Sequence, residues 1–200
     1  MPETNDVMPV SESLPDGYEE VLHWNVTEKR SRVIALNISG VVFFVFFGLI
    51  FSGLVARLGK LHEFRFGLLE IGVVFIAIVL TLVLHELTHG LLMRIFGARP
   101  KYGILWKGLM FYATSPGYAY PRNAYIVIAL APFVLISFLV ILGMWALQGT
   151  LWVALLGICG TINASGAIGD MWITMMVVRY ATRAYVMDER DGTRVFLPKR

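Results

Sequence analysis

The residues most able to do chemistry in this 200-residue chain stand together, in the segment His85-Glu86-Leu87-Thr88-His89. On a helix, His85 and His89 share one face because they are four residues apart, so both imidazoles can bind one metal ion. Glu86 lies beside such an ion, where a carboxylate can take a proton from a water molecule. Zinc suits imidazole and carboxylate ligands and tolerates an open position. The pattern predicts a zinc-dependent hydrolytic site with Glu86 as the catalytic base.

The composition of the chain strengthens this prediction. Hydrophobic residues make up 57% of the chain and charged residues only 16%, whereas a soluble domain typically has about 45–50% and about 25%. The site therefore falls within a membrane-type apolar stretch, at residues 66–93, where ionisable side chains are costly and by default indicate function. Cys159 is the only cysteine, which excludes a thiolate zinc site and an internal disulfide. The alternative is a pair of hydrogen-bonded core histidines without a metal.

A catalytic zinc ion usually has three protein ligands, and Asp170 is the candidate for the third. It is the only charged residue of the last apolar stretch, and a metal would supply the partner that a carboxylate in lipid needs. His85 stands nine residues before Arg94. Asp170 likewise stands nine residues before Arg179, so the two side chains are expected at the same depth. The alternative is a salt bridge or a protonated, hydrogen-bonded carboxyl. Asp188 is assigned to a polar tail and is not a candidate.

Asn163 stands two helical turns before Asp170, on the same face. Its amide can hydrogen-bond a substrate carbonyl or an oxyanion at the site. A polar contact that holds helices together is an equally good interpretation. Four nearby glycines are interpreted as places where helices pack closely: Gly157, Gly160, Gly166 and Gly169.

The elements that must position these residues are membrane spans, each of which needs about 20 apolar residues. Apolar stretches at 33–56 and 66–93 predict the first two helices. The apolar region from 123 to about 178 is too long for one helix and is expected to break at Gln148-Gly149-Thr150. The predicted fold class is an all-α polytopic membrane protein with about four transmembrane helices. A short extended, β-like segment is expected between the second and third helices, within residues 97–122, where glycines and prolines favour turns.

The basic residues indicate the orientation, because cytosolic loops carry an excess of lysine and arginine. With the amino terminus in the cytosol, all but three of the 17 basic residues lie inside, the exceptions being Arg57, Lys60 and Arg65. Both termini are therefore expected in the cytosol, and the site near the cytosolic face. No signal peptide is expected, since residues 1–32 are rich in acidic residues and lack an apolar region.

These features together resemble a known pattern. The metal motif is followed by three further segments: Gly97-Ala98-Arg99, Ile128-Ala129-Leu130-Ala131-Pro132, and Asn163 with Asp170. The arrangement is similar to the site-2 protease group of intramembrane zinc metallopeptidases, in which a later aspartate followed by glycine is the third ligand; here Met171 follows. The small size and the lead Leu14-Pro15-Asp16-Gly17-Tyr18 look more like the DUF3267 group of zincin peptidases, over about residues 14–180. The resemblance implies hydrolysis of a peptide bond within or beside the membrane.

The prediction is a zinc metalloendopeptidase of a prokaryotic cell membrane, in which His85, His89 and Asp170 hold Zn²⁺ and Glu86 is the base. Its expected partners are membrane lipid and a transmembrane or membrane-associated protein substrate, not nucleic acid. Residues 102–115 are expected to offer an extended edge to which the unwound substrate adds as a strand. Two alternatives remain. The first is a non-hydrolytic membrane metal-binding protein, which would need the histidines but not Glu86. The second is a purely structural four-helix protein, in which the polar cluster would have no evident role.

Three parts of the chain follow from this prediction. Residues 1–32 are expected to form a cytosolic amino-terminal segment. Residues 33–180 are expected to form a membrane-embedded, metallopeptidase-like domain. Residues 181–200 are expected to form a polar cytosolic tail.

Overall fold

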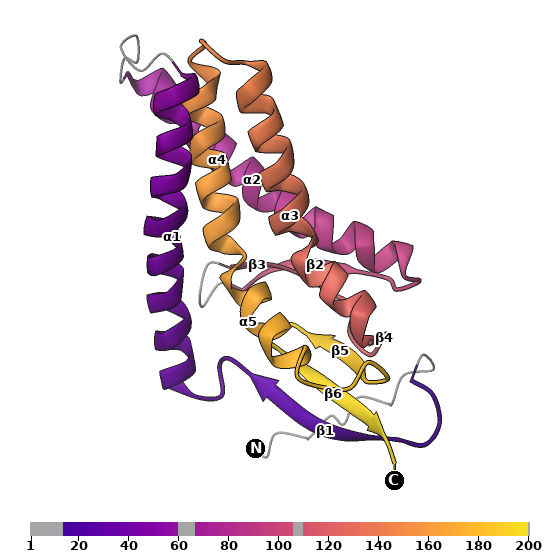
Figure 1. Cartoon of the computed structure of the whole chain (residues 1–200). Helices are drawn as coiled ribbons and strands as arrows, with labels where there is room; N and C mark the ends of the chain where they lie inside the picture. Colours follow the sequence, from indigo (N-terminus) through magenta and orange to yellow (C-terminus); the bar gives the residue numbers. More distant parts are fainter. Residues whose placement is uncertain (1–13, 60–66, 106–109, 200) are drawn as a thin grey trace.

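Long apolar helices form the body of the protein. The computed structural model describes residues 14–59, 67–105 and 110–199. The described helices are α1 (Arg30–Leu58), α2 (Leu68–Ile95), α3 (Arg122–Ala146), α4 (Trp152–Gly166) and α5 (Ile168–Val177). Within the described residues, four helical stretches are long and apolar enough to cross a membrane, with α4 and α5 counted as one (Figure 1). The expectation of about four such helices is confirmed, with ends within three residues of those predicted.

The outward faces of these helices are apolar. On α1, Val41 is 64% exposed and Leu49 is 69% exposed, and on α2 Phe75 is 66% exposed. Soluble monomers rarely expose apolar surface this extensive. Such faces are what a helix presents to lipid, where the backbone must satisfy its own hydrogen bonds.

Two of the four glycines in question permit close packing of α4 on α1. A side chain added at Gly157 would meet Val55, and one added at Gly160 would meet the ring of Phe51. The interpretation of Gly157 and Gly160 is therefore confirmed. It is wrong for Gly166 and Gly169, because no atom of another helix lies within 4 Å of where their side chains would begin.

The last span is broken between α4 and α5, at Ala167. Hydroxyls bond back to the helix just before the break: Thr161 donates to the Gly157 carbonyl at 2.9 Å, and Ser165 donates to the Thr161 carbonyl at 2.8 Å. Such bonds compete with the helical ladder and bend helices. The break starts a new helix whose first turn contains Asp170.

The predicted all-α class is correct only in part, because the structure also contains strands. Four of them form an antiparallel sheet in the order β1-β6-β5-β4: β1 (Tyr18–Asn25), β6 (Gly192–Pro198), β5 (Tyr185–Glu189) and β4 (Ala119–Pro121). Strand β1 pairs with β6 from opposite ends of the chain, with Tyr18 opposite Pro198. The amino- and carboxy-terminal segments thus join one sheet, a long-range pairing that no local pattern in the sequence reveals.

The connection between α2 and α3 is extended, as predicted. Strands β2 (Lys101–Leu105) and β3 (Met110–Thr114) pair antiparallel as a separate two-stranded sheet, and β4 follows. Pro116 and Gly117 form the turn between β3 and β4, where Gly117 has a positive φ of 78°.

The four-stranded sheet lies at one end of the helices (Figure 1). Its fully buried residues Tyr120, Val186 and Val195 pack in one core with Met93 of α2 and Val177 of α5. This core fixes the ends of the same helices that carry the candidate site residues. The sheet therefore contributes to the geometry of the site although it lies outside the helical body.

Candidate metal centre

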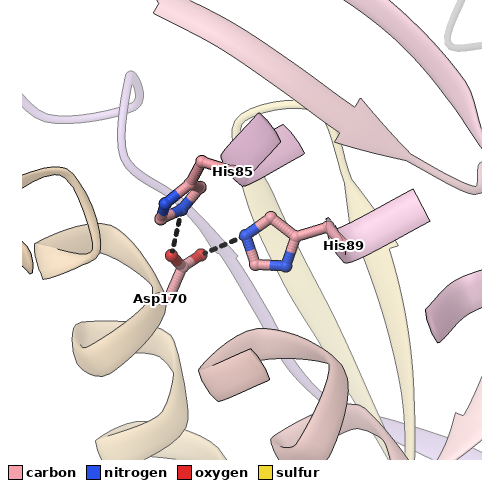
Figure 2. Close-up of side chains that lie close together, drawn as sticks. All are labelled: His85, His89 and Asp170. Atoms are coloured by element: carbon pink, nitrogen blue, oxygen red, sulfur yellow. Dashed lines mark hydrogen bonds and ion pairs between the residues drawn. The ribbon is translucent and has the colours of Figure 1, made fainter. Parts of the chain in front are cut away.

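The three predicted ligands come together from two helices (Figure 2). His85 and His89 project from α2, and Asp170 projects from the first turn of α5. Nε2 of His85 lies 3.1 Å from Oδ2 of Asp170, and Nε2 of His89 lies 3.4 Å from Oδ1. One ligand atom from each residue lies within 4.8 Å of the others. Both histidines are buried, at 6% and 7% exposed.

Hydrogen bonds on the far side of each imidazole fix its proton. Nδ1 of His89 lies 2.9 Å from the carbonyl oxygen of Ile128, which can only accept, so Nδ1 carries the hydrogen. Nδ1 of His85 lies 3.0 Å from Oδ1 of Asn163. The amide nitrogen of Asn163 donates to the Pro132 carbonyl at 3.2 Å, which fixes which end of the amide faces His85. With both Nδ1 atoms protonated, both neutral rings present a lone pair on Nε2.

Pro132 explains why the Ile128 carbonyl is available. In a regular helix, the N–H of residue 132 would bond the carbonyl of residue 128. Proline has no N–H, so its position inside α3 leaves the Ile128 oxygen free for His89. The carbonyl of Pro132 itself accepts from Asn163. Pro132 therefore acts on both histidines: it leaves the Ile128 carbonyl free for His89, and its own carbonyl holds the Asn163 amide that bonds His85.

The residues present fit a zinc ion. Zinc binds imidazole nitrogen and carboxylate oxygen at about 2.0–2.2 Å, so donors around a tetrahedral ion lie about 3.3 Å apart. The two distances from the histidines to Asp170, 3.1 and 3.4 Å, match that spacing. Histidines that bind a metal usually donate their other ring N–H to a carbonyl, carboxylate or water, and both histidines here bond an amide or peptide oxygen on that side.

Comparison with models of known protein families shows which family the chain belongs to. The model of the family DUF3267, described as "Putative zincin peptidase", matches residues 78–185, just over half of the chain. The chain belongs to DUF3267. Searches among curated proteins and among solved structures each find no match.

The DUF3267 match extends from within α2 to the first residue of β5. It therefore includes both histidines, Glu86 and Asp170, together with Pro132 and Asn163. The family description implies zinc, which agrees with the donor set of the three ligand candidates.

Glu86 lies next to the ligand candidates in this DUF3267 protein without being one of them. It is half-buried, and its carboxylate interacts with the backbone N–H of Ala113 in β3. It lines the same cavity as His85, His89 and Asp170. A carboxylate in this position can reach a water molecule or substrate at the triad.

A cavity of about 690 Å³ connects the site to several elements. Its walls come from α1, α2, β3, α3, α5 and the β5–β6 hairpin, and Gly166 and Gly169 contribute open space at the α4–α5 break. Most of the lining residues on α1 and before His85 on α2 are apolar, as at Leu36, Phe44 and Leu82, and Asn37 is the polar residue among them. The cavity thus combines an apolar channel between helices with a polar centre.

The side chain of Asn163 contacts protein groups of neighbouring helices, as in the alternative interpretation of a polar contact that holds helices together. It is 1% exposed, and its amide has three protein partners: His85, the Pro132 carbonyl and the hydroxyl of Ser137 at 3.2 Å. These contacts hold the Asn163 amide in one position, and its oxygen in turn fixes the orientation of the His85 ring. The role of the Ile128 carbonyl was not predicted, although a proline inside an apolar helix indicates a free carbonyl four residues earlier.

Replacing Pro132 by alanine is expected to weaken zinc binding about 10- to 100-fold, the usual effect of losing an outer partner of a ligating histidine. The new N–H would bond the Ile128 carbonyl and compete with His89. Zinc affinity, measured by competition with a fluorescent chelator on purified protein, tests this. The matched control is Ala131→Gly, which changes the neighbouring residue without adding an N–H. Equal affinities for wild type and Pro132→Ala would contradict the expectation.

Proposed function

We propose that this protein is an intramembrane zinc metallopeptidase that hydrolyses a peptide bond of a transmembrane or membrane-associated protein near the cytosolic face. His85, His89 and Asp170 hold the zinc ion, Glu86 is the general base, and Asn163 orients His85 in place of a substrate contact. The proposed mechanism is based on the resemblance to site-2 proteases. That resemblance rests on the two histidines with Glu86, on the later aspartate and on the apolar helices.

The observation that carries the proposal is the position of Glu86. A site that only stores or transfers a metal ion needs ligands alone. A carboxylate that lies beside the ligands, in a cavity large enough for a peptide segment, would have no role in such a site. Glu86 lines the cavity with the triad and interacts with Ala113 of β3. This arrangement supports hydrolysis over metal handling.

The roles of the side chains follow from this geometry. Zinc, when bound, supplies Lewis-acid polarisation of the scissile carbonyl and acidifies the attacking water. Glu86 accepts the proton of that water and delivers it to the leaving amine. The Ile128 carbonyl and the Asn163 amide keep the two imidazoles in their ligating tautomers. The apolar walls on α1 and α2 hold the hydrophobic part of the substrate.

The substrate must be extended at the scissile bond, because a helix uses its own carbonyls. Strand β3 pairs with β2 on one side, and its residues Phe111 and Ala113 line the cavity. The N–H of Ala113 interacts with Glu86, so this edge faces the site. Backbone groups alternate sides along a strand, which directs the N–H of Phe111 to the same edge. We propose that the substrate adds to β3 as a further strand.

Phe111→Pro is expected to lower peptide cleavage at least about 10-fold, because proline removes one edge N–H that a docked strand needs. Zinc content should not change, since β3 contributes none of the ligand candidates. The matched control is Phe111→Ala, which removes a ring but keeps the N–H. Cleavage that falls equally in the two variants would assign the effect to the side chain and contradict docking on this edge.

Metal removal tests the function itself. The full chain, purified in lipid nanodiscs, is incubated with fluorogenic transmembrane peptides that differ in their juxtamembrane sequences. Cleavage of at least one peptide should be lost with 1,10-phenanthroline and restored by stoichiometric zinc but not by magnesium, which prefers oxygen ligands. Cleavage that persists after the metal has been removed would overturn the zinc mechanism.

A further inference from the structure

A second polar position lies in the cavity, away from the metal centre. Asp188, at the end of β5, lines the same cavity as the triad. The buried hydroxyl of Tyr125 on α3 donates to Oδ1 of Asp188 at 3.0 Å. Asp188 thus comes from the four-stranded sheet and reaches the wall of the cavity that lies between the helices. None of the roles proposed above uses it.

Asp188 differs from the adjacent Glu189 because no ion pair includes it, and it differs from Asp191 because its partner is a buried side chain. Glu189 lies 3.1 Å from Nε2 of His23, and its other oxygen lies 3.8 Å from the guanidinium of Arg194. Asp191 accepts a hydrogen bond from Thr27 at the protein surface. Among the ion pairs of the described residues, none includes Asp188, and the side chains that hydrogen-bond with it are the neutral hydroxyls of Tyr125 and Thr114. Burial raises the pKa of the Asp188 carboxyl to about 7, although its hydrogen bonds with Thr114 and Tyr125 act in the opposite direction.

The position is close enough to the metal centre for one substrate to reach both. Tyr125 stands three residues before Ile128 on α3, which is about 4.5 Å along the helix axis. The Ile128 carbonyl bonds His89, and the Tyr125 hydroxyl bonds Asp188. One turn of α3 therefore links the two positions, and both open into the cavity between them.

We propose that Asp188 binds a lysine or arginine side chain of the substrate, just beyond its membrane-spanning segment. This inference rests on the proposed function and adds the substrate feature that the site selects. Cationic side chains are enriched where transmembrane segments leave the membrane on the cytosolic side. A partly buried carboxylate that a phenol already orients forms a charge-assisted hydrogen bond with such a group. The apolar walls receive the span, and Asp188 selects the flanking cation.

The test uses designed peptides with a leucine- and alanine-rich span and an extended polar flank. One lysine is placed at each of five successive flank positions, and glutamine replaces it in the control set. Binding is measured to the full chain carrying Glu86→Gln, in phosphatidylglycerol nanodiscs that contain no cationic headgroup. At the best position, the lysine peptide should bind about 10-fold more tightly than its glutamine counterpart, a difference of about 1.4 kcal/mol. Adding Asp188→Asn should remove this preference and leave binding of the glutamine peptide unchanged.

Matched variants keep the result interpretable. Asp188→Asn retains an oxygen for the Tyr125 hydroxyl, so the local packing is preserved. Asp16→Asn makes the same change at an exposed position outside the cavity and should retain the lysine preference. If Asp188→Asn does not fold, Asp188→Glu, which keeps the charge, should retain a preference for lysine. A lysine preference that survives in Asp188→Asn, or the absence of any preference in the parent, overturns the proposal.

Binding and cleavage fail independently in this design. If the chain with Glu86 intact cleaves none of the peptides but the Asp188-dependent preference is present, the cation subsite stands and peptide hydrolysis does not. If cleavage occurs without an Asp188-dependent preference, hydrolysis stands and the subsite is overturned.

Discussion

Replacing Glu86 by glutamine is expected to lower peptide hydrolysis by about 100- to 10,000-fold while the protein still binds one zinc ion per chain. The amide has nearly the same shape as the carboxylate, but it cannot accept a proton from the attacking water. Because Glu86 is not among the three ligand candidates, the metal site should keep its affinity. Turnover of the fluorogenic peptides and zinc content, measured on the same preparation, test the two halves of this expectation.

Glu70→Gln is the matched control, since it makes the same change on the same helix. The Glu70 carboxylate accepts from the Gly67 N–H at 3.0 Å at the start of α2 and does not line the cavity. Its replacement should change hydrolysis less than about threefold. A membrane metal-binding protein without hydrolytic activity would tolerate Glu86→Gln as well as Glu70→Gln in every assay. That outcome would favour the alternative function.

Most of the candidate site could be predicted from the sequence, because its histidines are close together in the sequence and its surroundings are unusually apolar. The two histidines are four residues apart on one helix, and an ionisable residue in an apolar span has few reasons to be there. Asp170 could be found from its depth, because both spans end in an arginine nine residues later. Spacing on separate helices is informative here because the membrane gives both helices the same reference plane.

The parts that the sequence did not reveal depend on long-range contacts. Strands β1 and β6 pair although they lie near opposite ends of the sequence. Strand β1 is short and half-exposed, so its apolar residues show no periodic pattern that would predict it. Asp188 was assigned to a polar tail for the same reason, although the sheet brings it into the cavity. Gly166 and Gly169 look like packing glycines by composition. Only the break at Ala167 turns them toward open space.

Asp170→Ala is expected to lower zinc affinity by more than about 100-fold, a larger effect than the loss of an outer partner such as the Ile128 carbonyl. Removal of the carboxylate leaves only two protein ligands, whereas a catalytic zinc site normally has three. Zinc content of the detergent-purified protein and competition with a fluorescent chelator measure the loss. Asp16→Ala, at an exposed position outside the cavity, should bind zinc like wild type.

The competing interpretation of the same geometry is a metal-free network of protonated imidazoles and one carboxylate. It predicts no stoichiometric zinc in carefully handled wild type. It also predicts that Asp170→Ala destabilises the fold, because two buried cations would lose their counter-ion. The zinc site predicts a different result in each comparison, because the reference for Asp170→Ala is then wild type without its metal. Wild type should contain about one zinc ion per chain, and the thermal midpoint of Asp170→Ala should approach that of wild type stripped of metal, since bound zinc is the main stabilisation that the variant loses.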